Sequence, residues 1–441
     1  MNKRMYRARR LLVTVAVLLL AFASSAGAEE RIRDARGKNG MVASAHPLAS
    51  QVGVDILKAG GNAVDAAVAV GFALGVVEPN ASGIGGGGLM LIWLADSGRT
   101  VFIDFREKAP TGAAADMFEL DEEGSIKPDD RGFNPAVVGG RSVAVPGEVA
   151  GLLLAQQKFG SMARAQVMQP AIGLAEQGIT VSEVLAGLIA ENYDVLLGYP
   201  ESSAIYLSDD FPKSPGETVR NTDLAATLRL VAEQGRDGFY TGRVAQSIVN
   251  AVQADGGSIT MEDLAGYLPS YRAPVRGQYR GYDIVSSPPP SSGGAHVIEL
   301  LNIMEHYDLA AMGPDSADSL HAWGEAMKLA YADRAVFMGD SDFVLVPTEE
   351  LASKAYAKKR FELIDMDKAM PEYGAGDPTA GDSGSTTHYS VIDAAGNMVA
   401  CTKTINHFFG SGITAPGTGV LLNDQMDDFE KAPGGANSIE A

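Results

Sequence analysis

The sequence predicts an α+β fold in which helical and strand patterns occupy different stretches of the chain. Residues 44–77 and most of residues 146–363 place apolar side chains at helical spacing, whereas residues 89–105 and 387–405 have the patterns of strands. Of the 441 residues, 46% are hydrophobic and 20% are charged, which is the composition of a folded globular protein and not of a disordered chain. We therefore expect one large core built from both kinds of element.

The first 28 residues have the layout of a secretory signal peptide. Five basic side chains between residues 3 and 10 precede an apolar run over residues 11–22, and small residues follow up to Ala28. The apolar run is shorter than the roughly 20 residues that a membrane-spanning helix needs. We expect cleavage after Ala28, no stable membrane span and a periplasmic or secreted location.

The charge and the cysteine content exclude several classes of protein. A net charge of −20 argues against a nucleic-acid partner, because phosphate binding needs clustered Lys and Arg. The single cysteine, Cys401, excludes a disulfide within the chain and a thiolate metal cluster, and we expect it to be a buried apolar residue. The six histidines include no pair four residues apart and no H-E-x-x-H motif, so the sequence predicts no metal site and no cofactor.

Two helices are predicted at the start of the mature chain. Residues 44–59 carry apolar side chains at helical spacing and end before Gly60 and Gly61, which are typical helix terminators. Asn62 is expected to cap a second helix over residues 63–77. This second helix is apolar on nearly every face, which predicts that it is buried.

A glycine-rich loop precedes a predicted hairpin. Residues 85–88 are all glycine and lead directly into the apolar run of residues 89–94. A phosphate-binding glycine loop follows a strand and opens a helix, so this order argues against a dinucleotide site. A turn at residues 96–98 joins the run to a second strand, residues 100–105, and we expect the two strands to form a buried hairpin that ends at Arg106.

The middle of the chain is predicted to be mainly helical, and a linker follows it. Residues 371–385 are rich in Gly, Asp and Pro, which predicts an exposed linker. No composition break divides the region before this linker into domains. Amphipathic patterns predict helices at residues 149–158, 224–233, 243–254, 295–305 and 319–337.

A β-hairpin is predicted directly after the linker. Residues 387–392 and 398–405 alternate between apolar and polar side chains. The loop between them has Gly396 as its third residue, which suits a three-residue hairpin loop with a left-handed glycine. Pairing across this loop places Thr386 opposite Thr404, and a single bulge would shift that register.

Several distant blocks of the chain resemble the γ-glutamyltransferase family, whose members are also called γ-glutamyl transpeptidases. The segment S-T-T-H-Y-S-V-I-D at residues 385–393 is similar to the cleavage and nucleophile segment of these N-terminal-nucleophile hydrolases. The resemblance covers essentially the whole mature chain and implies an αββα sandwich with a helix-rich large subunit. Further similar blocks, in the family's order, lie at residues 60–67, 104–107, 406–410 and 422–429.

The resemblance implies a precursor that cleaves itself between Ser385 and Thr386. Residues 29–385 would be the large subunit and residues 386–441 the N-terminal part of the small subunit, and the two subunits would stay associated. A hydroxyl is a poor nucleophile unless a base takes its proton, and the free α-amine of a new N-terminal threonine supplies that base. Before cleavage this nitrogen is an amide, so self-cleavage is also the activation step.

The resemblance assigns the other site residues as well. It implies that Thr404 is the second catalytic threonine, which supports the nucleophile. Arg106 would hold the α-carboxylate of the γ-glutamyl group, where a planar guanidinium gives bidentate geometry. Asn406, Gln425 and Asp428 match the residues that bind the α-amine of the substrate.

The implied activity is that of a γ-glutamyltransferase and glutathione hydrolase. Thr386 would attack the γ-amide of glutathione or another γ-glutamyl compound, and the acyl-enzyme would pass its glutamyl group to water, an amino acid or a peptide. One alternative is a glutaryl or β-lactam acylase of the same superfamily, whose substrate lacks the α-amine. A second alternative is a truncated, non-catalytic binding protein, because the chain stops at Ala441 whereas family members continue with Ser-Ser-Met and Gly-Gly tracts.

Overall fold

The structure, a computed structural model, describes residues 35–371, 374 and 385–429. The predicted signal peptide, most of the predicted linker and residues 430–441 lie outside these ranges. All described helices and strands belong to one compact unit that begins at Gly40. None of the described helices combines the length and the apolar character that a membrane span requires.

A six-stranded antiparallel sheet forms the centre of this unit. Its strand order is β1-β11-β12-β2-β3-β8, and every neighbouring pair is antiparallel. The strands are β1 (Gly40–Ala43), β2 (Gly87–Leu94), β3 (Arg99–Asp104), β8 (Ser270–Arg272), β11 (Ser385–Asp393) and β12 (Met398–Asn406). Two-stranded ribbons elsewhere pair β4 (Ile179–Thr180) with β7 (Thr218–Val219), β5 (Leu207–Ser208) with β6 (Phe211–Pro212), β9 (Val275–Tyr279) with β10 (Tyr282–Ser286), and β13 (Thr414–Ala415) with β14 (Val420–Leu421).

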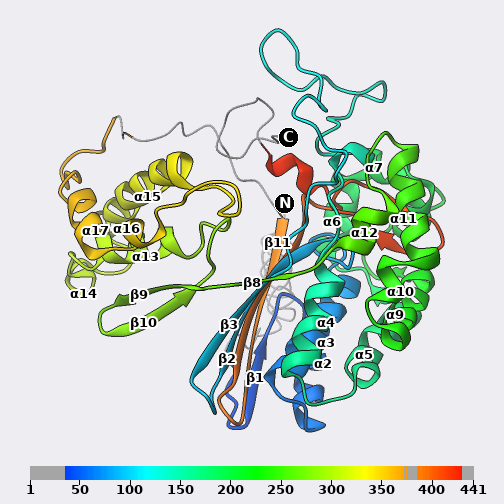
Figure 1. Cartoon of the computed structure of the whole chain (residues 1–441), viewed down its shortest axis with the longest axis horizontal. Coiled ribbons are helices and arrows are strands. Elements are labelled where there is room, and N and C mark those ends of the chain that lie inside the picture. Colours follow the sequence, from blue (N-terminus) through cyan, green and yellow to red (C-terminus); the bar gives the residue numbers. More distant parts are fainter. Residues whose placement is uncertain (1–34, 372–373, 375–384, 430–441) are drawn as a thin grey trace, which may run out of the picture. The chain divides into compact units, whose positions relative to one another are not determined.

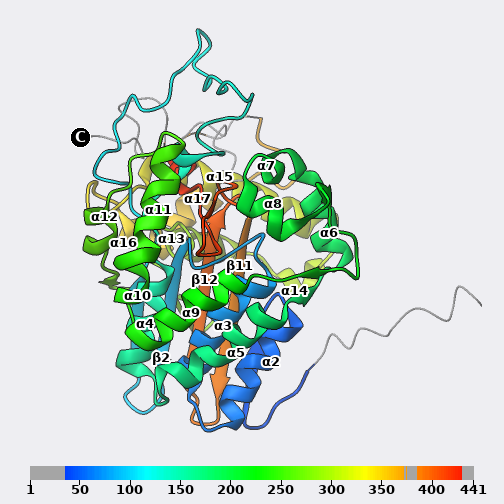
Figure 2. The ribbon, with the colours of Figure 1, turned by 90° about the vertical axis from the view of Figure 1, so that its right-hand side faces the viewer.

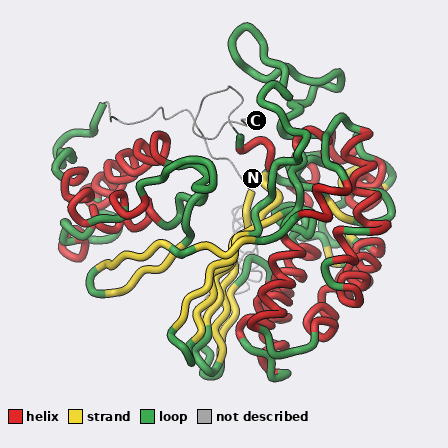
Figure 3. Tube along the Cα trace, viewed as in Figure 1, coloured by secondary structure: helices red, strands yellow, loops and turns green. Residues whose placement is uncertain are grey.

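Strands from opposite ends of the sequence are neighbours in the central sheet. β1 pairs with β11, and β12 pairs with β2, which continues into β3 through the predicted hairpin. Figure 1 shows these blue and orange strands side by side, and Figure 3 shows the same strands in yellow. The sheet therefore places the end of β3 and the start of β11 in one region of the fold.

Two layers of helix cover one face of the sheet. α3 (Ala63–Val77) lies against β11 and β12, and α4 (Glu148–Phe159) lies against β2. α5 (Arg164–Gln177) packs on α3, and α9 (Thr222–Gln234) packs on α5, as Figures 1 and 2 show. Every residue of α3 is buried, which confirms the expectation for a helix that is apolar on all faces.

The other helices surround this core or form a smaller group with a core of its own. α13, α15 and α17 enclose that second core, which includes Ile303, Ala322 and Ala357. The helices are α2 (Pro47–Lys58), α6 (Glu183–Glu191), α7 (Tyr193–Leu197), α8 (Pro200–Tyr206), α10 (Asp237–Tyr240), α11 (Gly242–Ala254), α12 (Met261–Gly266), α13 (Ala295–Met304), α14 (Leu309–Met312), α15 (Ala317–Phe337), α16 (Thr348–Leu351) and α17 (Lys354–Phe361), with 3₁₀ turns η1 (Gly140–Ser142) and η2 (Gln425–Asp428).

The long helices were predictable from their patterns. The five helices expected in the middle of the chain are confirmed as α4, α9, α11, α13 and α15, each within two residues of its predicted ends. Asn62 caps α3 as expected, with its side-chain oxygen accepting from the backbone N–H groups of Val64 and Asp65. α2 begins three residues later than predicted, because Pro47 occupies its first position and His46 caps it.

The predicted hairpin is confirmed in both loop and register. Asp393 donates its backbone N–H to the carbonyl of Asn397 at 3.1 Å, and Gly396 is left-handed with φ 85°. Thr386 lies opposite Thr404, as the loop geometry predicted. The one irregularity lies between Ser385 and Thr386, where the register shifts because Ser385 pairs with Asn406. The bulge thus falls at the predicted cleavage bond.

β12 has one face buried against helices and one face directed away from them. Cys401 and Lys403 are fully buried on the helix side, which confirms the expectation for the cysteine. The Lys403 ammonium donates to Glu148 Oε1 at 2.5 Å and to the carbonyl of Gly71 in α3 at 2.6 Å. Burial raises the pKa of Glu148 to about 7, while the attraction of Lys403 opposes that rise. An ion pair is therefore enclosed directly behind β12, the strand that neighbours the predicted nucleophile strand β11.

Lys403→Met should destabilise the protein in a pH-dependent way. It leaves Glu148 buried without its partner, which is expected to lower the free energy of unfolding by about 3–5 kcal/mol at about pH 8. The loss should shrink at about pH 5, where the folded state keeps Glu148 protonated and neutral while the unfolded chain releases that proton. Urea denaturation at both pH values measures this. Glu148→Gln/Lys403→Met is the control and should recover most of the stability; a double variant as unstable as the single one would contradict the expectation.

Candidate active site

The predicted nucleophile lies at the exposed start of β11. Thr386 is exposed, and its hydroxyl donates to Thr404 Oγ1 on the neighbouring strand at 3.4 Å. The Thr404 hydroxyl also accepts the backbone N–H of Asn406 at 2.8 Å. The structure therefore brings the two predicted catalytic threonines together and connects the second one to a predicted substrate-binding residue.

Asn406 ends β12 in an unusual backbone conformation. Its φ is 76°, in the left-handed region that asparagine tolerates better than most residues. The side chain is nearly buried, with 5% exposure, and its Nδ2 donates to the carbonyl of Asp424 at 3.1 Å. This conformation turns the chain out of the sheet at the bulge and directs it toward the segment that carries the other predicted site residues.

Arg106 and Asp428 form an ion pair at the rim of this region. Arg106 follows β3, and its Nη2 lies 2.6 Å from Asp428 Oδ2, with the two side chains 33% and 35% exposed. The same Asp428 oxygen accepts a hydrogen bond from Gln425 Nε2. Three of the residues that the resemblance assigned to substrate binding are thus in contact, although Arg106 is more than 300 positions away from the other two.

Asn423 attaches the segment of residues 423–428 to the rest of the fold. It is fully buried, and its Nδ2 donates to the carbonyls of Gly85 and Ala144, each at 2.8 Å. Its Oδ1 accepts the backbone N–H groups of Ala144 at 3.0 Å and Gln425 at 2.9 Å. All of the side chain's principal hydrogen-bonding capacity is used, so this segment has a fixed position relative to the glycine loop.

The glycine loop has a packing role in this arrangement. A Cβ on Gly85 would collide with the carbonyl of Leu421, and one on Gly86 would collide with the carbonyl of Thr404. Only glycine permits so close an approach of the loop backbone to β12 and to the segment before Asn423. β2 begins at Gly87, which confirms that the glycines lead into a strand and not into a helix.

Two acidic groups near the site were not singled out from the sequence. Both carboxylate oxygens of Glu107 are buried and lack a hydrogen-bond partner among the described residues. Burial raises the pKa of Glu107 to about 8, although Arg106 opposes the shift. Asp424 is fully buried and binds His407, to which the sequence assigned no role beyond its place in the family-like block of residues 406–410. Nothing local in the sequence indicates that either carboxyl group is enclosed.

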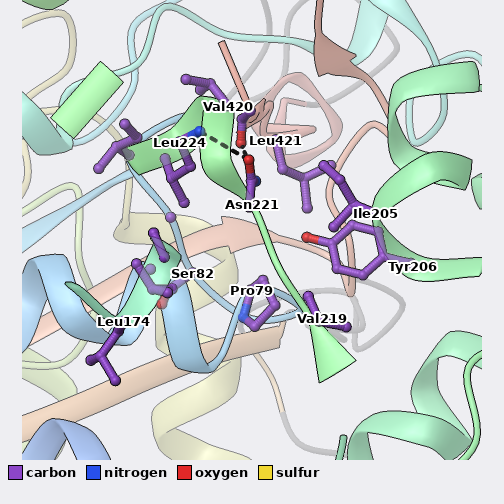
Figure 4. A pocket seen from close by; sticks show the side chains of 16 residues that line it. Pro79, Ser82, Leu174, Ile205, Tyr206, Val219, Asn221, Leu224, Val420 and Leu421 are labelled. Carbon is purple, nitrogen blue, oxygen red and sulfur yellow. Dashed lines mark hydrogen bonds between the residues drawn. The ribbon is translucent and has the colours of Figure 1, made fainter. Parts of the chain in front are cut away.

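A small cavity among the described residues lies away from these side chains. It holds about 20 Å³, enough for roughly one water molecule, and none of the predicted site residues lines it. Figure 4 shows Tyr206, Leu224 and Val420 around it, with Asn221 accepting the backbone N–H of Leu224 at 2.9 Å. Among the described residues, no three His, Cys, Asp or Glu side chains gather in a way that could hold a metal ion.

Comparison with known proteins places this chain in a family. A family model described as Gamma-glutamyltranspeptidase matches residues 49–441. The chain belongs to the γ-glutamyltranspeptidase family. It is 48% identical to the glutathione hydrolase proenzyme of Escherichia coli (strain K12), across 94% of this chain and 71% of the relative. It is also 46% identical to the acylase ACY 1 proenzyme of Pseudomonas sp. (strain SE83), across 92% of this chain and 72% of the relative.

Solved structures support the predicted fold class. The γ-glutamyltranspeptidase of Helicobacter pylori superposes with a TM-score of 0.73 at 44% identity, over 79% of this chain and 100% of that one. The cephalosporin acylase of Bacillus halodurans gives a TM-score of 0.80 at 31% identity, over 93% and 74%. The chain therefore has the fold of this enzyme family, a mixed α/β fold of the N-terminal-nucleophile hydrolase type. One sheet and its helical side of the predicted sandwich lie within the described residues.

Asn423→Ala should destabilise the γ-glutamyltranspeptidase fold measurably. The change leaves the buried N–H and carbonyl of Ala144 without partners and removes one of the two hydrogen bonds to the carbonyl of Gly85, which is expected to lower the free energy of unfolding by about 2–4 kcal/mol. Urea denaturation followed by circular dichroism checks this. Asn250→Ala is the matched control, because Asn250 is exposed on α11 and its loss should change stability by less than about 0.5 kcal/mol. Equal effects of the two substitutions would contradict the role given to Asn423.

Proposed function

We propose that this protein is a γ-glutamyltransferase and glutathione hydrolase that works through a threonine acyl-enzyme. One observation carries the proposal. The exposed Thr386 hydroxyl forms a hydrogen bond with Thr404 at the start of β11, and neighbouring segments supply Arg106 and Asp428 as an ion pair. Relatives named glutathione hydrolase proenzyme support it. Glutathione, other γ-glutamyl compounds and acceptor amino acids or peptides are the proposed substrates.

Self-cleavage between Ser385 and Thr386 is the proposed activation step. The bond lies at the bulge of β11, and the glutathione hydrolase and acylase relatives both carry the name proenzyme. Cleavage would divide the mature chain into residues 29–385 and 386–441 and give Thr386 a free α-amine. That amine has an ordinary pKa of about 7.7–8.0, so a useful fraction is neutral and can act as a base. Removal of residues 1–28 as a signal peptide, and hence a periplasmic or secreted location, belongs to the same proposal.

The proposed substrate site balances the charges of a γ-glutamyl group. Its α-carboxylate would bind Arg106, and its α-ammonium would bind Asp428 with Gln425 and Asn406. Without substrate, Arg106 and Asp428 neutralise each other at 2.6 Å. A zwitterionic group can replace both halves of this pair at once, so neither charge is left without a partner.

The proposed reaction has two halves. The Thr386 α-amine takes the hydroxyl proton while Oγ1 attacks the γ-carbonyl carbon, with Thr404 orienting the hydroxyl through the hydrogen bond between them. The resulting tetrahedral intermediate expels the leaving amine, which receives the proton, and leaves an ester between the γ-glutamyl carbon and Thr386. Water or an acceptor amine then attacks this ester and restores the threonine, which predicts ping-pong kinetics.

An acylase that acts on glutaryl groups is a second candidate. The likeness to the ACY 1 proenzyme and to a cephalosporin acylase favours it. A glutaryl group has the carboxylate of a γ-glutamyl group but lacks the α-amine, so it would leave Asp428 paired only within the protein. Higher kcat/KM on a glutaryl anilide than on a γ-glutamyl anilide would favour this candidate over the transferase.

The wild-type protein should separate into two chains on denaturing electrophoresis. N-terminal sequencing of the smaller chain is expected to begin at Thr386. Thr386→Ala should remain uncut, because it lacks the attacking hydroxyl, and should show no turnover of L-γ-glutamyl-p-nitroanilide. A wild-type protein that stays in one piece and is inactive would overturn the proposed function.

Two substitutions should separate carboxylate binding from amine binding. Arg106→Gln is expected to raise the KM for L-γ-glutamyl-p-nitroanilide and the inhibition constant of glutarate, each by about 10–100-fold, since both molecules present a carboxylate. Asp428→Asn is expected to raise only the KM of the γ-glutamyl compound, because glutarate has no amine. Steady-state kinetics on self-cleaved protein measures both constants. Parallel effects of the two substitutions on both ligands would contradict the assigned contacts.

A further inference from the structure

A buried carboxylate joins the two segments from which the proposed amine-binding residues come. Asp424 is fully buried, and its Oδ1 accepts the backbone N–H of His407 at 3.0 Å while its Oδ2 lies 2.6 Å from His407 Nδ1. Its backbone takes part as well, since the N–H donates to the carbonyl of Ile405 at 3.2 Å and the carbonyl accepts from Asn406 Nδ2. Asp424 thus makes four contacts with residues 405–407 across the gap between the segments.

The contacts define how the imidazole is protonated. A carboxylate can only accept, so the short contact requires that His407 Nδ1 carries a proton and donates it to Asp424. Asn406 Nδ2 lies 3.3 Å from the same ring nitrogen, and it donates one of its two hydrogens to the Asp424 carbonyl. The hydrogen bond to Asp424 raises the pKa of His407, and burial raises the pKa of Asp424 to about 6 although His407 opposes it.

The other polar groups around His407 belong to the same site. Its Nε2 lies 3.9 Å from Asp427 Oδ2, and the side chain is 26% exposed. Asp428 also raises the pKa of the imidazole, which places both charges in one electrostatic environment. His407 follows Asn406 in the chain, and its ring lies beside Asp424 and Asp427, in the segment that also carries Gln425 and Asp428.

We propose that His407 and Asp424 form a clamp that holds Asn406 in position relative to Gln425 and Asp428, so that His407 is a positioning residue for the α-amine of the γ-glutamyl donor. This inference rests on the proposed function. The clamp acts through geometry: Asn406 is left-handed at the end of β12, and Asp424 fixes both its side chain and the residue after it. Loosening the clamp should weaken amine recognition while leaving Thr386 and Thr404 paired in the register of β11 and β12.

Kinetics of His407→Phe and His407→Asn test the clamp on the full chain after self-cleavage. Phenylalanine keeps a ring but loses the Nδ1 donor, and it is expected to raise the KM for L-γ-glutamyl-p-nitroanilide about tenfold with kcat changed less than about threefold. Asparagine places its Nδ2 where Nδ1 lies, and it should keep the KM within about threefold of wild type. The inhibition constant of glutarate, which has no amine, should be unchanged in both variants.

Asp424→Leu and His321→Phe complete the set. Asp424→Leu removes both side-chain oxygens that contact His407 with little change in side-chain size, and it should raise the same KM even if His407→Phe does not fold. His321 lies on α15, where its ring contacts the carbonyl of Asp365, and His321→Phe should leave the kinetic constants at wild-type values.

The outcomes separate the inference from the function on which it rests. A raised KM that is specific to the γ-glutamyl compound and rescued by asparagine supports the clamp. An unchanged KM, an equal loss of glutarate binding, or failure of asparagine to rescue overturns it while an active wild type still upholds the transferase. A wild type without turnover overturns the proposed function and the clamp together.

Discussion

The ion pair between Lys403 and Glu148 is the constraint on which the geometry of the site depends. A lysine that is fully buried must keep its partner, since an unpaired charge in the interior is strongly unfavourable. Side chains alternate along a strand, so a slip of β12 by one residue would expose Lys403 and turn Thr404 into the helical layer. The pair therefore fixes which face carries Thr404, and the hairpin register then places Thr386 opposite it.

Three other candidate site residues come from segments outside β11 and β12. Arg106 comes from the end of β3, and Gln425 and Asp428 come from a 3₁₀ turn that Asn423 fixes to the backbone beside the glycine loop. No regular element carries all of these residues, so their positions depend on fully satisfied side chains and on glycines that allow backbones to touch. The spacing of Arg106 and Asp428 thus depends on close packing between the glycine loop and the segment around Asn423, in addition to the sheet.

The sequence was informative where the determining forces are local. Asn62 and the apolar run after it define α3, and Gly396 with the lengths of two alternating runs defines the hairpin and its register. Other features depend on contacts between distant residues. β1 is four residues long and takes its place only by pairing with β11, and α5 contains Pro170, which a pattern search treats as a break. Arg106 and Asp428 were grouped through family resemblance, because spacing alone cannot join them.

The environments of three acidic residues near the site also could not be predicted from the sequence, and they bear on how the proposed site would recognise a substrate with two charges. Asp424, Glu107 and Asp428 are ordinary carboxylates in the sequence, and only the fold gives each a different environment. The Asp424 carboxylate is buried and contacts His407, whereas Asp428 is 35% exposed and is paired with Arg106, the residue proposed to bind a substrate carboxylate. An α-amine can then displace the guanidinium from Asp428 without breaking the contacts of Asp424. The proposed recognition of a group that carries both charges depends on this division between one structural and one exchangeable carboxylate.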